Sequence, residues 1–173
     1  LKSIESSIKS PLEYWDTNLS ITLTLLSVMQ KYNCFTIIFS SSASVYKTKG
    51  SSFLKESDSL EPCNPYGKTK LTIESILKDL FESDYKNEWR IANLRYFNPA
   101  GAHESGLLGE NPKFHSLNLF PSIIRSIDGV QKKLQIFGKD WPTRDGTCIR
   151  DFIHVMDLAE AHMATLDYLN NTK

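Results

Sequence analysis

The sequence predicts an α/β fold in which a parallel sheet is covered by helices on both faces. Short apolar runs rich in β-branched residues alternate along the chain with segments whose apolar residues recur at helical spacing. This alternation is typical of parallel strands joined by crossover helices. Ligands of such sheets bind at the carboxyl ends of the strands, so we look for a functional site there.

A long helix is expected over residues 11–31. Ser10 and Glu13 fit a capping box, and Pro11 stands at the first helical position. The apolar residues at helical spacing in this segment are Leu12, Trp15, Leu19, Leu23, Leu26 and Met29.

A buried strand and a second helix follow. The run FTIIFS at 35–40 is apolar and β-branched, as expected for a strand buried on both faces. Asn64 is an expected N-cap, and Pro65 begins a helix that reaches about Tyr85.

The remaining elements are predicted in the same way. The segment 90–97 is expected to be the next strand, and a helix is expected at about 116–129. Strands are predicted at 134–137 and 151–155, and the acidic N-cap Asp157 is expected to open the last helix.

Composition excludes several classes of function. Lysine plus arginine number 20 and aspartate plus glutamate number 20, so the zero net charge argues against a nucleic-acid partner. No apolar run approaches the ~18 residues of a membrane span. Cys34, Cys63 and Cys148 lie far apart, which favours reduced thiols in a cytoplasmic protein. The start at Leu1 and the polar end favour a central piece of a longer protein.

Two features carry candidate chemistry. Ser40 to Ser44 follow the first strand, where their hydroxyls either line a polar pocket or form a solvated loop. Tyr66 and Lys70 are four residues apart, so both lie on one helical face. A phenol has a pKa of about 10, and a nearby ammonium and a helix N-terminus both favour its phenolate form. The spacing also occurs by chance, so alone it is a weak signal.

Longer strings give a stronger signal. The serine-rich strand end followed by Tyr-x-x-x-Lys resembles the short-chain dehydrogenase/reductase superfamily. LRYFNPAGAHESGLLGE at 94–110 and IFGKDWPTRDGTCIRDFIHVMDLAEAH at 136–162 resemble the UDP-glucose 4-epimerases, also called UDP-galactose 4-epimerases. The resemblance implies that residues 1–173 are the central part of an NAD-binding, Rossmann-type doubly wound parallel sheet, with the substrate-binding region beginning at about 98.

The resemblance also implies a set of site residues. The catalytic residues would be Ser42, Tyr66 and Lys70. The cofactor-binding residues would be Lys2, Asn18, Ser40, Ser42, Tyr66, Lys70 and Phe97. The substrate-binding residues would be Ser42, Tyr66, Asn98, Asn118, Leu119, Phe137 and Arg150.

The implied reaction is an NAD-dependent interconversion of UDP-galactose and UDP-glucose by transient oxidation at carbon 4 of the sugar. The implied cofactor is NAD, the partner is a UDP-sugar, and no metal is expected. We call the longer protein that would contain this chain the full-length parent. It is expected to be a homodimer in which helices 11–31 and 65–85 form a bundle.

The chain departs from the family pattern at three places. Lys47 stands where glycine is usual, and Thr17 stands where asparagine is common. No G-x-x-G-x-x-G loop occurs, so the N-terminal phosphate-binding unit and the C-terminal end are expected to be absent. We therefore expect the 173 residues alone to be inactive and to bind NAD weakly.

Other functions remain open from the residues. A sugar-nucleotide 4,6-dehydratase carries Thr-Asp-Glu where this chain has Ser42, Ala43 and Ser44, and the last two cannot supply the acid and base of elimination. A non-enzymatic sugar-nucleotide-fold protein is a further alternative. A Ser-His-Asp hydrolase lacks its G-x-S-x-G turn here.

Individual residues also have structural interpretations. Phe97 and Phe137 are alternatively core residues, and Asn98 a turn residue. Arg150 is alternatively half of a surface ion pair with Asp151. His154 and His162 have no third ligand at metal spacing, so we interpret them as structural.

Overall fold

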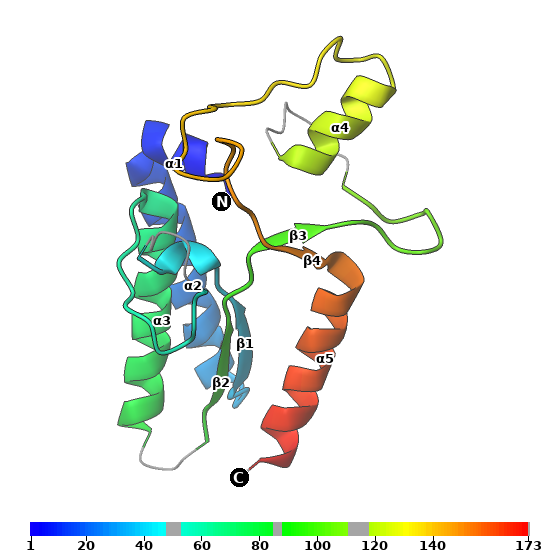
Figure 1. Cartoon of the computed structure of the whole chain (residues 1–173). Helices are drawn as coiled ribbons and strands as arrows, with labels where there is room; N and C mark the ends of the chain where they lie inside the picture. Colours follow the sequence, from blue (N-terminus) through cyan, green and yellow to red (C-terminus); the bar gives the residue numbers. More distant parts are fainter. Residues whose placement is uncertain (48–52, 85–87, 111–117, 173) are drawn as a thin grey trace. The chain divides into compact units, whose positions relative to one another are not determined.

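The computed structural model describes residues 1–47, 53–84, 88–110 and 118–172, which fold into two compact units (Figure 1). The first unit contains Leu1–Tyr96 and the chain from His162 onward, and the second contains Phe97–Ala161. In the described part of the chain, each unit has one two-stranded parallel sheet. The predicted α/β class with parallel strands is therefore confirmed.

The first unit places helices beside its sheet. Its helices are α1 (Ile4–Lys9), α2 (Pro11–Lys31) and α3 (Pro65–Ser83), and its strands are β1 (Thr36–Ser40) and β2 (Arg90–Leu94). The predicted helix 11–31 is confirmed at both ends, although the Ser10 side chain makes no capping hydrogen bond. The short helix α1 was missed. The expected end of the second helix at Tyr85 lies outside the described residues.

The pairing of β1 with β2 determines where the site lies. The register runs from Thr36 opposite Arg90 to Ser40 opposite Leu94. Because the two strands are parallel and end at the same level, the segments that begin at Ser41 and Arg95 leave the sheet at one edge. This is the edge where ligands of α/β sheets bind.

The core of the first unit lies between the sheet and its two long helices, which run side by side (Figure 1). Its buried members are Leu26, Met29, Ile73, Leu77 and Trp89. Apolar side chains of β1 and β2 pack against this cluster. Burial of these residues holds α3 against the sheet, and α3 carries two of the candidate catalytic residues.

The second unit contains β3 (Asn98–Ala100), α4 (Leu119–Ile127), β4 (Phe152–His154) and the first turns of α5 (Val155–Asn171). β3 pairs with β4, with Asn98 opposite Phe152. The expected start of α4 at 116 lies outside the described residues. No helix in the described ranges is long and apolar enough to cross a bilayer.

Three predicted elements need correction. The segment 90–97 is not one strand: β2 ends at Leu94, because its partner strand β1 ends opposite it at Ser40. The segment 134–137 is not a strand, since Leu134, Ile136 and Phe137 are exposed and no described strand pairs with them. The last helix begins at Val155 rather than beside Asp157.

His154 explains the earlier start of that last helix. Its Nδ1 atom accepts a hydrogen bond from the backbone N–H of Met156 at 3.3 Å. This contact satisfies one of the N–H groups that a helix leaves unpaired in its first turn. The structural interpretation of His154 is consistent with this contact.

Candidate active site

The serine-rich segment forms a tight turn at the carboxyl end of β1. The 3₁₀ helix η1 spans Ala43–Val45, and Ser42 is its N-cap. The Ser42 Oγ atom accepts hydrogen bonds from the Ser44 backbone N–H at 3.2 Å and from the Ser44 hydroxyl at 3.0 Å. The Ala43 N–H donates to the carbonyl oxygen of Tyr96 at 3.0 Å, which ties the turn to the segment after β2. These serines therefore form an ordered turn rather than a solvated loop.

The first turn of α3 packs directly against this serine turn. The buried Asn64 side chain accepts from the Gly67 N–H at 2.8 Å, which confirms the predicted N-cap. A Cβ atom at Gly67 would lie 2.5 Å from the carbonyl oxygen of Ser44. Glycine is thus required for this close approach. Sequence reasoning missed Gly67, although a glycine in a helical segment is itself a signal of close packing.

Ser42 and Tyr66 meet across this contact. The Ser42 side chain acts on the Tyr66 phenol as a hydrogen-bond partner that lowers the pKa. The Ser42 oxygen itself accepts two bonds from Ser44. Burial raises the pKa of the Tyr66 phenol above its ordinary value, and the bond from Ser42 acts in the opposite direction. The nearby phenols of Tyr96 and Tyr14 add to the increase in pKa.

Lys70 lies on the same helical face as Tyr66, as the spacing predicts. Its Nζ atom is 5.8 Å from the centre of the Tyr66 ring and 4.7 Å from that of Phe39. It donates a hydrogen bond to the Ser40 carbonyl oxygen at 2.9 Å. Burial lowers the pKa of the Lys70 ammonium.

One electrostatic expectation is wrong for this structure. We expected Lys70 and the helix N-terminus to lower the pKa of Tyr66, but that pKa is raised. The phenolate loses solvation when the side chain is buried, and this cost exceeds the stabilisation that its neighbours provide. The group that lowers the pKa is Ser42, through a direct hydrogen bond.

Ser40 connects the site to α5. Its hydroxyl is hydrogen-bonded to His162 Nε2 at 3.2 Å, while its carbonyl holds Lys70. The His162 ring also lies 6.3 Å from the Tyr96 ring. Among the residues that the structure describes, no group of His, Cys, Asp and Glu side chains could hold a metal ion.

Asn18 and Lys2, the two N-terminal residues expected to bind the cofactor, differ in their position relative to α3. Asn18 donates to the buried Thr69 hydroxyl at 3.1 Å, and Thr69 donates to the Tyr66 carbonyl oxygen at 2.8 Å. This places Asn18 beside the first turns of α3. Lys2 is exposed, and within the described residues it forms no hydrogen bond or ion pair with Asn18, Thr69 or Tyr66.

The remaining candidates belong to the second unit. Phe97 is 39% exposed and Phe137 is 63% exposed, so neither is a core residue in this structure. Asn98 is the first residue of β3 rather than a turn residue, and its side-chain amide donates to the Asp151 carbonyl oxygen at 2.9 Å.

Asn118, Leu119 and Arg150 are also exposed. Asn118 is the N-cap of α4, and Leu119 is its first residue. Arg150 donates to the carbonyl oxygen of Ile149 at 3.0 Å.

Comparison with known proteins identifies related chains. The family model described as the NAD dependent epimerase/dehydratase family matches residues 1–173. The bifunctional protein gal10 of Schizosaccharomyces pombe is 52% identical over 98% of this chain and 24% of its own length. The UDP-glucose 4-epimerase of Bacillus subtilis is 46% identical over 99% of this chain and 50% of its own.

A solved structure extends the comparison to the fold. The UDP-glucose 4-epimerase of Bifidobacterium longum, in complex with NAD⁺ and UDP, superposes with a TM-score of 0.90 at 49% identity. The match covers 96% of this chain and 50% of that one. The chain thus spans about half the length of this epimerase and of the Bacillus enzyme.

Proposed function

The chain belongs to the NAD-dependent epimerase/dehydratase family, and we propose that its full-length parent interconverts UDP-galactose and UDP-glucose by transient oxidation at carbon 4 of the sugar. The observation that carries this proposal is the placement of Tyr66 and Lys70 at the end of β1, with the Lys70 ammonium 5.8 Å from the centre of the Tyr66 ring and Ser42 acting on the phenol. The relatives named as UDP-glucose 4-epimerases support the same reaction.

The residues present fit the nicotinamide end of NAD. An ammonium has three N–H donors, and the bond to Ser40 uses one of the three at Lys70. The rest suit the hydroxyls of a ribose. We propose that Lys70 and Ser40 hold this part of NAD, and that Asn18, Lys2 and Phe97 are further cofactor-binding residues. When bound, NAD supplies a reversible hydride acceptor that is regenerated in each turnover.

The chain's own residues handle the proton of this reaction. Oxidation at carbon 4 releases a hydride from carbon and a proton from the 4-hydroxyl, and leaves a 4-keto sugar. We assign the proton to the Tyr66 oxygen, which accepts it on oxidation and returns it on reduction. Ser42 donates a hydrogen bond at the same place and stabilises the phenolate. Return of the hydride to the other face of the sugar gives the epimer.

The substrate-binding region is proposed to begin at about 98, close to where the second compact unit begins at Phe97. Arg150 is assigned to the diphosphate, because a guanidinium fork matches phosphate oxygens. Phe137 is assigned to the uracil ring, and Asn98, Asn118 and Leu119 to other parts of the UDP-sugar. The exposure of Phe137, Asn118, Leu119 and Arg150 supports these assignments, whereas Asn98 is partly buried.

The parent is further proposed to be a cytoplasmic homodimer. Cys34, Cys63 and Cys148 are exposed free thiols, which fits a reducing compartment. Leu12 of α2 is 82% exposed and Ile21 of the same helix is 62% exposed, so α2 offers apolar surface to a second copy. Light scattering of the purified parent would give twice the mass of one chain, whereas the mass of one chain would rule the dimer out.

The test of function uses the full-length parent purified without added cofactor. We expect NAD to be released on denaturation, and proton NMR to show UDP-galactose converting to UDP-glucose. The same equilibrium mixture should be reached from either sugar, without net formation of reduced NAD. A 4-keto-6-deoxy product would identify a dehydratase instead. Absence of both NAD and turnover would favour a binding protein.

A further inference from the structure

A buried ion pair lies beside the catalytic residues but outside the proton-transfer step. Glu74 of α3 is 5% exposed, and its carboxylate pairs with Arg95, the first residue after β2. Arg95 Nε lies 3.0 Å and 3.1 Å from the two carboxylate oxygens, and Nη2 lies 2.6 Å from Oε2. The hydrogen bonds to Glu74 raise the pKa of the Arg95 guanidinium further above its usual value, so this guanidinium stays charged.

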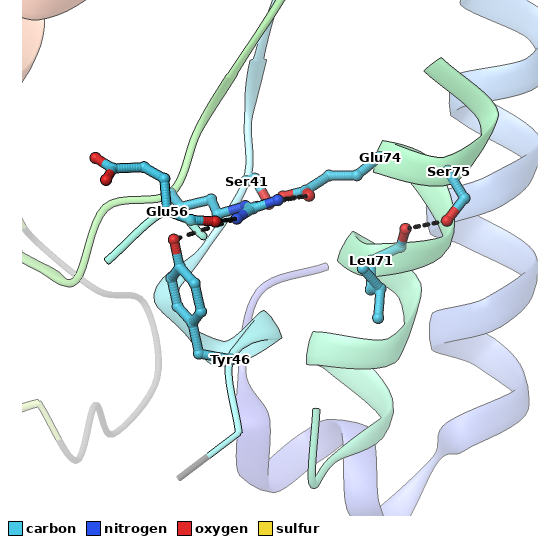
Figure 2. Close-up of polar contacts among 7 residues, drawn as sticks. Ser41, Tyr46, Glu56, Leu71, Glu74 and Ser75 are labelled. Atoms are coloured by element: carbon cyan, nitrogen blue, oxygen red, sulfur yellow. Dashed lines mark hydrogen bonds and ion pairs between the residues drawn. The ribbon is translucent and has the colours of Figure 1, made fainter. Parts of the chain in front are cut away.

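Glu74 reaches one end of the serine turn at Ser41, and Arg95 reaches the other end at Tyr46; Figure 2 shows Ser41, Tyr46 and Glu74. The Ser41 hydroxyl donates to Glu74 Oε1, and Arg95 Nη1 donates to the Tyr46 hydroxyl at 3.2 Å. Nη1 also donates to the Glu56 carbonyl oxygen at 3.3 Å. Ser41 and Tyr46 are the residues on either side of Ser42–Val45. We call Ser41, Tyr46, Glu74 and Arg95 the clamp.

We propose that the clamp is a positioning device that holds the Ser42 hydroxyl against the Tyr66 oxygen. This inference rests on the proposed function. Glu74 lies four residues after Lys70 and eight after Tyr66, so all three stand on one face of α3. The clamp therefore ties the turn that carries Ser42 to the helix face that carries its partner.

Burying the charges of Glu74 and Arg95 costs free energy of hydration, and a gain in stability alone does not explain why a charged pair is used here. A buried ion pair loses the hydration of both charges, and apolar residues of similar volume often give an equal or greater stability. Here the carboxylate and guanidinium are hydrogen-bonded to both flanks of one short turn. Fixing that turn is a role that an apolar pair would not perform, because it has no directional bonds.

The pH dependence of activity reports whether Ser42 stays in position beside Tyr66. The groups that face Tyr66 are Lys70 of the same helix, Tyr14 of α2, and Tyr96 after β2, which contacts His162 of α5. Clamp variants leave all of these in place. If Ser42 moves away from Tyr66, the phenol loses the bond that lowers its pKa, and the activity profile shifts to higher pH.

The experiment uses the full-length enzyme with its bound NAD and the variants Ser41→Ala and Glu74→Gln. Each should lower kcat for UDP-galactose about tenfold near neutral pH, with KM within about twofold, and recover activity toward alkaline pH. Rates are normalised to bound NAD, which removes any unfolded fraction. The matched controls are Ser75→Ala, whose hydroxyl bonds Leu71, and Glu82→Gln, whose ion pair with Lys78 is exposed.

The outcomes distinguish a positioning role of the clamp from a purely structural role of its ion pair. Equal loss at every pH, or unchanged normalised rates, would overturn the proposal while the proposed function stands. Should Glu74→Gln fail to fold, Ser41→Ala decides alone, since it removes one hydroxyl. An inactive wild-type parent would overturn the proposed function and, with it, the clamp.

Discussion

The Lys70 ammonium donates to the carbonyl oxygen of Ser40 at 2.9 Å and lies 5.8 Å from the centre of the Tyr66 ring. The lysine is thus anchored on the end of β1, and it faces the phenol without bonding to it. We propose that its charge acts on Tyr66 through space, over a distance that the strand anchor fixes.

Replacing Lys70 with methionine keeps the length of the side chain but removes the charge. In the full-length enzyme the pKa of Tyr66 should rise further, because a phenolate is less stable without a nearby cation. The profile of kcat against pH should move to higher pH. The control is Lys68→Met, an exposed lysine on the same helix. A profile that stayed in place would show that Lys70 does not tune the phenol.

Ser42→Ala should remove the bond that lowers the pKa of Tyr66. We expect kcat to fall by about tenfold or more near neutral pH, with partial recovery at alkaline pH, where more of the phenol is ionised. Ser27→Ala serves as the control, because its exposed hydroxyl bonds only the Leu23 carbonyl of its own helix among the described contacts. Normal turnover by Ser42→Ala at neutral pH would remove Ser42 from the mechanism.

Gly67→Ala should destabilise the full-length protein by about 1–3 kcal/mol, because the new methyl group would overlap the Ser44 carbonyl oxygen. The sign of this change in the free energy of unfolding is informative, since alanine is otherwise favoured over glycine in helices. Urea unfolding measures the change. The control Gly109→Ala has its nearest neighbour, the Ala102 Cβ atom, at 3.4 Å and should stay within about 0.5 kcal/mol. A Gly67→Ala protein as stable as wild type would show that the helix and turn separate easily.

Arg150→Ala should weaken binding of UDP itself as well as of UDP-sugar by about tenfold or more, since a charged hydrogen-bond partner is lost. Isothermal titration of the full-length protein measures both affinities. The neighbouring exposed Arg144→Ala is the control. Arg150 and Asp151, both within the described ranges, form no ion pair with each other, so equal UDP affinities would leave Arg150 without a proposed role.

Local patterns were enough to predict much of the fold. Helix α2 was predicted to its ends from Pro11 and its apolar spacing, and the N-cap Asn64 was identified correctly. Both depend on residues near in sequence. The 134–137 segment shows the limit, because a strand requires a partner strand and apolar composition alone does not provide one.

In the candidate site, too, local features were predicted from the sequence and features that depend on distant segments were not. The Tyr66 and Lys70 spacing follows from helix geometry, and their shared face was predicted correctly. The direction of the Tyr66 pKa shift was not, because burial depends on packing by segments far away in sequence. Glu74 and Arg95 were missed for that reason too. Their ion pair joins α3 to the end of β2, and no local pattern marks it.

The central claim is that the Tyr66 oxygen carries the proton, and Tyr66→Phe tests it most directly. The substitution keeps the ring, so the full-length protein should fold and retain bound NAD. Turnover of UDP-galactose, normalised to NAD and measured across pH, should fall by ~10²-fold or more at every pH, with no alkaline recovery of the kind expected for Lys70→Met. Near-normal turnover by folded Tyr66→Phe protein would contradict the account and leave the Tyr66–Lys70 spacing as a coincidence.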